Sequence, residues 1–527
     1  MTTQHSMNSF LKGAALLTLA GFFVKLLSAI YRVPFQNLVG DEGFYIYQQV
    51  YPFVAIFGIW TSYGFAVAVS KMLAEQPHGE HAGIVRTASW LIAGIAIAAF
   101  ATLYAGAGFF ANRMGDPELS SLLRAGAFAV VFMAPLAIMK GRLQADGQMA
   151  PVASAQITEQ AVRVGVILVG SYAVVSSGLS LYAAGQVAIA AAGAGAFAAM
   201  LLLIRSYRKQ GTLAIGVKFK GTARKLFMTS LGVSMSSLLL VLFQLVDSFT
   251  VYRLLADQLG DMQAMIEKGV YDRAQPLVQF GILLATSLTL SLVPLIARAN
   301  RQKAGRSPEL YASLAFRVSF LFACAAAAGL TLVMPHVNET LFKTADGSLA
   351  LIIFSWQIIS MSIVLVLTAI LYGFGKIRVP ALLLVSGLVL KLIGNLLLVP
   401  IYGIIGAAIA GNIGLGFIAL VLVWYFKRVW PLRFAPLRFY GWLTVAISAM
   451  SLTVLGYEAF IMPLVAGWPE RLGAVFITLT AVPLGGAVFL LAAAKSRLIT
   501  EKEWYIIPFG RRLAALQLAV NPRKKRS

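Results

Sequence analysis

Residues 181–204 read LYAAGQVAIAAAGAGAFAAMLLLI, and no charged side chain interrupts them. The next segment, residues 205–225, reads RSYRKQGTLAIGVKFKGTARK and contains seven Lys and Arg side chains but no acid. About 20 apolar residues cross the bilayer core, which is about 30 Å thick, as one helix. Lys and Arg side chains gather in the loops on the cytoplasmic side. These neighbouring segments therefore predict a transmembrane helix that ends in a cytoplasmic loop.

The same pattern fills the chain. Of its 527 residues, 59% are hydrophobic and only 12% are charged, against roughly 25% charged in a soluble domain. Membrane-spanning strands are shorter and alternate in polarity, so these windows predict helices. We expect an all-α polytopic membrane protein with about fourteen transmembrane helices, at residues 13–33, 44–71, 86–111, 121–140, 152–174, 181–204, 226–251, 274–297, 312–334, 349–372, 380–399, 404–426, 441–463 and 472–494.

The net charge of +23 follows from the predicted topology. Basic side chains gather in the even-numbered loops, such as 298–306 and 427–438, and in the C-terminal tail, whereas acids such as Asp116 and Glu267 lie in odd-numbered loops. We therefore expect a cell-membrane protein with both termini in the cytoplasm. A nucleic-acid-binding protein would carry its basic residues on a polar surface, so nucleic acid is not an expected partner.

Two motifs recur at nearly one offset, which indicates an internal duplication. Residues 41–45 read DEGFY after the first span, and residues 267–271 read EKGVY after the seventh. Residues 154–163 contain Ser-x4-Glu-x3-Arg, and residues 386–395 contain Ser-x4-Lys-x3-Asn. Many transporters are built from two similar halves. The predicted division is an N-terminal lobe of helices 1–6 at 1–225, a C-terminal lobe of helices 7–12 at 226–426, appended helices 13 and 14 at 427–494, and a basic cytoplasmic tail at 495–527.

Three cations lie too deep in predicted helices to reach water along the lipid face. Lys25, Arg163 and Lys391 are each eleven to thirteen residues into a span, or roughly 16–20 Å at 1.5 Å per residue. Ser28 and Arg32 share one helix face with Lys25 because they follow it at i+3 and i+7. A charge at the bilayer centre costs at least about 2.5 kcal/mol, so these five residues are the candidate substrate-binding side chains.

Two acids accompany the deep cations. Glu159 can pair with Arg163 four residues later, and Asp247 can pair with a cation of the opposite lobe or bind a coupling ion. Salt-bridged helix contacts and the lining of a cavity both remain open as interpretations. The surplus of cations favours a cavity that attracts an anion such as phosphate. Arg124 and Arg317 lie nearer the ends of their spans and are expected to snorkel.

Enzyme signatures are missing from the sequence. It contains no HExxH motif, no GxSxG motif, no Walker A loop and no paired acids typical of a metal-dependent glycosyltransferase. Cys324 is the single cysteine, and His78 and His81 have no third metal ligand nearby. We therefore expect a protein that is not an enzyme, with no catalytic residue, no metal and no cofactor.

Several motifs, read together, carry a family resemblance. They are FLKG at 10–13, the segment 39–45, VAVSK at 67–71, the glycine-rich run 141–151 that leads to Glu159 and Arg163, YGIIGAA at 402–408 and PFGRRL at 508–513. With these motifs the chain resembles the polysaccharide-transport branch of the multidrug/oligosaccharidyl-lipid/polysaccharide (MOP) exporter superfamily, near the stage V sporulation protein B-like proteins and the lipid II flippases.

The resemblance implies two lobes around a central cavity that opens alternately to either side. It implies a flippase that carries a polyprenyl-diphosphate-linked oligosaccharide, a cell-wall or polysaccharide precursor, to the outer leaflet among membrane lipids. The family's cationic cavity residues fall on Lys25 and Arg32. An ion-coupled multidrug exporter of the same superfamily and a non-transporting scaffold of wall synthesis are the alternatives. The identity of the sugar, the oligomeric state and the driving force, whether membrane potential, proton or sodium, stay open.

Overall fold

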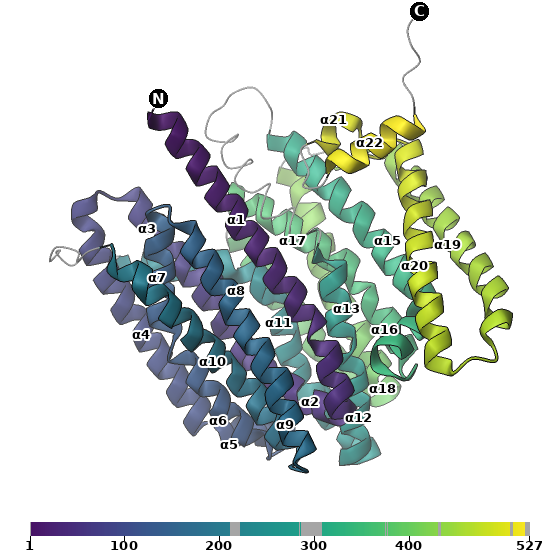
Figure 1. Ribbon diagram of the computed structural model, residues 1–527, viewed down its shortest axis with the longest axis horizontal. Helices are drawn as coiled ribbons and strands as arrows, with labels where there is room; N and C mark the ends of the chain where they lie inside the picture. Colours follow the sequence, from purple (N-terminus) through teal and green to yellow (C-terminus); the bar gives the residue numbers. More distant parts are fainter. Residues whose placement is uncertain are drawn as a thin grey trace, which may run out of the picture. The chain divides into compact units, whose positions relative to one another are not determined.

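A computed structural model describes residues 2–210, 222–283, 285, 308–374, 376, 378–429, 434–505 and 510–521 of the protein. All regular elements in these ranges are helices, and none is a strand (Figure 1). The predicted all-α class is confirmed. Most of the predicted span 274–297 lies outside the described residues, which in that region comprise 274–283 and 285.

Contacts group the chain into two compact units. The first contains the described residues up to Asp272 together with Lys391–Gly403. Its helices, with three short π or 3-10 segments, are α1 (Thr2–Ile30), α2 (Arg32–Ile59), η1 (Trp60–Phe65), α3 (Ala66–Glu75), η2 (His78–Glu80), α4 (His81–Ala105), α5 (Ala107–Met114), α6 (Leu119–Val130), α7 (Met133–Ala145), α8 (Met149–Gly165), η3 (Val166–Gly170), α9 (Ser171–Ser176), α10 (Leu181–Arg208), α11 (Thr222–Leu259) and α12 (Asp261–Asp272).

The second unit contains the described residues from Arg273 onward, apart from the segment Lys391–Gly403. Within it α15 packs against α17 and α20, and α19 packs along α20. Its helices are α13 (Ala274–Gly281), α15 (Pro308–Phe342), α16 (Ser348–Ser355), α17 (Gln357–Gly373), α18 (Arg378–Val429, whose middle part belongs to the first unit), α19 (Leu437–Val465), α20 (Glu470–Lys495), α21 (Glu501–Trp504) and α22 (Gly510–Val520).

Eleven helical stretches in the described residues are long and apolar enough to cross a membrane. Two of them, Leu19–Glu75 with 57 residues and Val379–Val429 with 51, are far longer than the roughly 20 residues that one crossing needs. Gly40 (φ 71°) and Gly403 (φ 57°) interrupt these two stretches with backbone angles that glycine adopts readily. The protein is therefore a multi-pass membrane protein, and the count of fourteen spans stays a prediction.

Two segments read as loops from the sequence are helical. The segment 39–45 departs from helical geometry only at Gly40, and the predicted outer loop 252–273 is formed by the end of α11 and by α12. Gly260 (φ 78°) separates these two helices, and Asp261 favours the start of α12 because an acid is stabilised at a helix N-terminus. The polarity of 252–273 suggested a loop, but the helix buries one polar face inside the protein.

The two copies of the first recurring motif, at 41–45 and 267–271, lie against each other in the first unit. Helix α12, which contains EKGVY, packs against α2, which contains DEGFY. At the contact, a Cβ atom added to Gly269 would lie 2.1 Å from the carbonyl oxygen of Asp41. Glycine at this position thus permits a close backbone approach. The two compact units are defined by their internal packing, which does not test whether the chain is duplicated. The predicted lobe boundaries at 225 and 426 therefore stay a prediction.

Replacing Gly269 with alanine is expected to force α2 and α12 apart. The new methyl group would meet backbone that no side-chain rotation can move, so we expect a destabilisation of about 1 to 3 kcal/mol. Gly58→Ala is the matched control, because a Cβ atom at Gly58, also in α2, meets nothing within 4 Å. Thermal unfolding of the purified variants measures the effect, and equal melting temperatures for the two variants would contradict it.

Candidate functional site

Lys25, Ser28 and Arg32 lie on one continuous helical path. Tyr31, between α1 and α2, keeps helical angles (φ −61°, ψ −23°). Pro34 has no N–H to donate to the carbonyl of Ile30. This missing hydrogen bond explains why α1 ends at Ile30 and α2 begins at Arg32, although the backbone stays helical between them. Ser28 Oγ donates to the Val24 carbonyl at 2.7 Å. Lys25 is half-buried, and within the described residues its ammonium has no ion-pair or hydrogen-bond partner.

Arg32 is completely buried. Its guanidinium lies over the ring of Tyr51, 4.7 Å from the ring centroid, beside a hydrogen bond of 2.7 Å between the hydroxyls of Tyr31 and Tyr47. Within the described ranges its Nε and Nη1 atoms have no hydrogen-bond partner. Buried guanidinium groups normally bind a carboxylate or several acceptors, since an unpaired buried charge is costly. Arg32 therefore has donor capacity to spare.

Asp247 is the centre of a second buried cluster, which we call the Asp247 network. Its carboxylate oxygen Oδ1 lies 2.8 Å from Nζ of Lys391 and accepts a hydrogen bond of 2.9 Å from Nδ2 of Asn395. Tyr271 donates its hydroxyl hydrogen to Oδ2 at 2.9 Å. Helices α11, α12 and α18 supply these four side chains, all of them buried. The structure thus places Lys391 in an ion pair.

Lys268 and Asp272 form a neighbouring buried pair on α12. Nζ of Lys268 lies 2.6 Å from Asp272 Oδ2, and Arg32 interacts electrostatically with the same carboxylate. Neither residue stood out in the sequence, because the many polar side chains of residues 252–273 are typical of an exposed loop. Their i, i+4 spacing was the available signal, since an acid and a base at that spacing meet on one helix face.

Glu159 is the centre of a third cluster. Its Oε2 atom lies 2.9 Å from Nζ of Lys140, and its Oε1 atom lies 3.7 Å from Nη2 of Arg163. Lys140 is completely buried and also donates to Ser62 Oγ at 3.0 Å. Lys140 is the last residue of the predicted span 121–140, where a lysine is expected to reach water. Helix α7 continues beyond this residue and packs closely at Gly141, where an added Cβ atom would lie 2.8 Å from the Ala66 carbonyl oxygen.

The three clusters leave an excess of positive charge in the first unit. Lys268 and Lys391 are each matched by an aspartate, whereas Glu159 serves two cations, and neither Lys25 nor Arg32 has a carboxylate within ion-pair distance among the described residues. Such a surplus suits an anion with several oxygens, because charge-assisted hydrogen bonds to phosphate are strong. No group of three or more His, Cys, Asp and Glu suited to a metal occurs in the described ranges.

Arg273 is a buried cation of the second unit that the sequence analysis did not single out. Its Nη1 atom donates to Oδ1 of Asn338 at 3.0 Å and to Oγ1 of Thr344 at 3.0 Å. The guanidinium therefore holds α15 to the segment that follows it. This arrangement connects elements of the fold and assigns Arg273 a structural role.

The two cations expected to snorkel behave differently. Arg124 is exposed on α6. Arg317 on α15 instead pairs with Glu503 on α21, and Nη1 of Arg317 lies 3.4 Å from Oε2 of Glu503. Burial opposes ionisation of this carboxyl, but hydrogen bonds from Arg317 and from the Thr500 N–H outweigh it and hold the pKa of Glu503 below its ordinary value. The pair anchors the short helix α21.

Acidification is expected to loosen α21. Because the pKa of Glu503 is lower in the folded protein than in the unfolded chain, its stabilisation is present above the unfolded value of about 4.3 and is lost as the pH falls through the folded value. Glu503→Gln should remove about 1 kcal/mol at neutral pH, which corresponds to about fivefold faster hydrogen exchange in residues 501–505. Unchanged exchange in this variant would contradict the anchoring role.

Sequence comparison assigns the chain to a family. The profile of the family described as "Polysaccharide biosynthesis protein" matches residues 10–300. Three proteins of Bacillus subtilis (strain 168) are similar over nearly full length. They are the uncharacterized membrane protein YabM (36% identical, 95% of this chain and 96% of the relative), stage V sporulation protein B (25%, 90% and 95%) and lipid II flippase MurJ (24%, 92% and 94%).

Solved structures share the fold. A lipid II flippase MurJ in an inward closed conformation matches with a TM-score of 0.69 at 16% identity, covering 92% of this chain and 99% of that one. An inward-facing multidrug resistance MATE family transporter of the MOP superfamily matches with a TM-score of 0.62 at 14% identity, covering 78% and 95%. The expected resemblance is confirmed: the chain belongs to the polysaccharide biosynthesis protein family, the polysaccharide-transport branch of the MOP superfamily of multi-pass membrane transporters and flippases.

Proposed function

We propose that the protein moves a polyprenyl-diphosphate-linked oligosaccharide, a precursor of cell wall or polysaccharide, from the inner to the outer leaflet by alternating access. The observation that carries the proposal is the buried guanidinium of Arg32, two of whose nitrogens have no hydrogen-bond partner among the described residues. A diphosphate supplies the oxygens that those N–H groups need. Two similar proteins are named a lipid II flippase and a stage V sporulation protein, which agrees with a lipid-linked wall precursor as substrate.

The proposed role of each candidate residue follows from the ion-pair partners that it has in the structure. Lys25 and Arg32 bind the diphosphate, and Ser28 lies on the same helix face. Arg163 adds positive charge to the site, because it shares the single carboxylate of Glu159 with Lys140. The polyprenyl tail stays in lipid, and both chain termini lie in the cytoplasm.

Lys391 becomes available in another step of the cycle. It is bound to Asp247 in this conformation. A proton or sodium ion at Asp247 would neutralise the carboxylate and release the lysine toward the substrate. Coupling of this kind links an ion gradient to movement of an anion, because each ligand favours a different arrangement of the same residues.

An exporter of cationic drugs is the less favoured function. Such a substrate needs carboxylates free to bind it, whereas Glu159 and Asp247 are both engaged by cations of the chain. Lys25 and Arg32, the candidate cations with no carboxylate within ion-pair distance among the described residues, would repel a cationic substrate.

Complementation tests the proposal in cells. Lys25→Ala should fail to restore growth to a strain depleted of its own wall-precursor flippase, while the amount of variant protein in the membrane stays equal to that of the wild type. Lys71→Ala, at an exposed lysine, is the matched control and should restore growth. Full growth with Lys25→Ala would reject the assigned site, and failure of the wild-type protein to complement would favour the scaffold role.

A further inference from the structure

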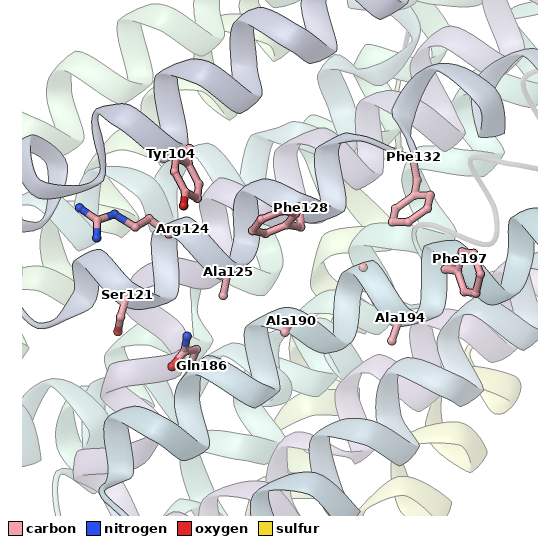
Figure 2. Close-up of a pocket in the computed structure, with 11 residues that line it drawn as sticks. Tyr104, Ser121, Arg124, Ala125, Phe128, Phe132, Gln186, Ala190, Ala194 and Phe197 are labelled. Carbon is pink, nitrogen blue, oxygen red and sulfur yellow. The ribbon is translucent and has the colours of Figure 1, made fainter.

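A groove on the first unit is formed by α4, α6 and α10, away from the clusters described above. It has a volume of about 680 Å³, which falls within the range of 300–1,000 Å³ for small-molecule sites. Figure 2 shows Arg124, Ser121, Gln186 and Tyr104 toward one end and the rings of Phe128, Phe132 and Phe197 along the rest. The polar groups are thus separated from a long apolar trough.

The polar end of the groove lies close to the ends of the three helices. Tyr104 precedes the last residue of α4, whereas Arg124 and Gln186 are in the second turns of α6 and α10. Arg124 is exposed and has no ion pair among the described residues, and Gln186, which lines the same end of the groove from α10, is exposed as well. A cation and an amide at this depth face the headgroup region of a bilayer.

The apolar part has small residues at its floor and aromatic rings at its sides. Ala190, Gly193 and Ala194 leave the surface of α10 low. The rings of Tyr104 and Phe128 meet edge to face with centroids 6.0 Å apart, and those of Phe132 and Phe197 are 5.9 Å apart. These rings remain partly exposed in helices that cross the membrane, so lipid covers them.

The length of the groove fits one leaflet. From Arg124 to Phe132 the chain advances eight residues, or roughly 12 Å, and from Gln186 to Phe197 roughly 16 Å. Half of the hydrocarbon core is about 15 Å thick. Pro135, which cannot donate to the Val131 carbonyl, explains why α6 ends at Val130 and the path bends at the inner end of the groove.

We propose that this groove is a binding site for one anionic glycerophospholipid, whose phosphate group contacts Arg124 and Gln186 and whose acyl chain lies along Phe128, Phe132 and Phe197. Complementarity carries the assignment: a single unpaired cation suits one phosphate, and the apolar trough suits a chain that ends near the bilayer centre. The lipid would hold α4, α6 and α10 together as a structural ligand, separate from the transported molecule.

Native mass spectrometry of the purified full-length protein tests the site. With phosphatidylglycerol and phosphatidylcholine supplied in equal amounts, the wild type should retain one phosphatidylglycerol in about tenfold preference, because the quaternary ammonium of phosphatidylcholine offsets the attraction of its phosphate to Arg124, whereas the phosphatidylglycerol headgroup has a net negative charge. Arg124→Gln should reduce the preference to about one. Ala194→Phe, which fills the trough, should abolish retention of either lipid at this site.

Arg113→Gln is the matched control, since Arg113 is an exposed cation at the end of α5 and does not line the groove. It should keep the wild-type preference. Each variant is compared only after it elutes from size exclusion as a single species like the wild type. Equal retention of both lipids by the wild type, or an unchanged preference in Arg124→Gln, would overturn the proposal.

Discussion

Replacing Lys391 with methionine is expected to destabilise the protein by about 3 to 5 kcal/mol. The lysine lies 2.8 Å from Asp247, and both side chains are buried. Methionine has nearly the length of lysine but no charge, so the variant leaves the carboxylate buried without its cation. Equilibrium unfolding of the purified protein, followed through the tryptophan signal, measures the loss.

A double variant separates the ion pair from the packing. Asp247→Asn combined with Lys391→Met removes both charges, keeps an acceptor oxygen for the donors of the network and should recover most of the lost stability, because a buried ion pair gains little over neutral groups of similar size. Lys71→Met is the control, since Lys71 pairs with Glu75 at 4.0 Å in an exposed position, and it should change stability by less than about 1 kcal/mol. A single variant as stable as the wild type would show that the network contributes nothing.

Arg32→Met is expected to slow transport by roughly tenfold to a hundredfold and to leave stability unchanged or higher. Two nitrogens of the buried guanidinium have no hydrogen-bond partner in the part of the chain that the structure describes. Replacing the side chain therefore removes the free-energy cost of burying this charge and breaks no ion pair. The substrate, in contrast, loses charge-assisted hydrogen bonds of about 1.5 to 3 kcal/mol each, or roughly tenfold to a hundredfold in rate. Flipping rates and unfolding measured on one preparation test both halves of the prediction.

Arg32→Met and Lys391→Met are expected to have different effects on stability and on transport. Each variant removes a buried cation, yet Lys391→Met is expected to lose stability and Arg32→Met to lose transport. Arg32→Lys should keep part of the activity, because it retains the charge and loses the paired donors of the guanidinium. A large loss of stability in Arg32→Met would mean that Arg32 supports the fold and is not held ready for a ligand.

The transmembrane helices could be predicted because a bilayer imposes a simple rule on sequence. Any window of about 20 apolar residues must satisfy its backbone internally, so α4, α10 and α20 follow from composition alone. The segment 252–273 could not be predicted in the same way. Its charges suggested water, but Lys268 and Asp272 neutralise each other inside the protein.

The sequence predicted the pair of Glu159 and Arg163, but it did not predict the partners of the other candidate residues. Depth along a helix identified Lys25, Arg163 and Lys391 as unusual, since each lies far from a helix end. Which of them is paired depends on contacts between helices distant in sequence, such as that of Lys391 with Asp247. Lys140 could not be identified as a buried residue from the sequence, because a lysine at the end of an apolar window usually lies at the cytoplasmic membrane surface.

The central claim is that cations without partners in the first unit bind a lipid-linked sugar diphosphate. Reconstituted vesicles test it directly, with fluorescent lipid II as the probe and its accessibility to an external reagent as the signal. The wild type should equilibrate the probe across the bilayer, while Lys25→Ala combined with Arg32→Met should leave the probe where it was added. Equal flipping by the wild type and this double variant would contradict the account.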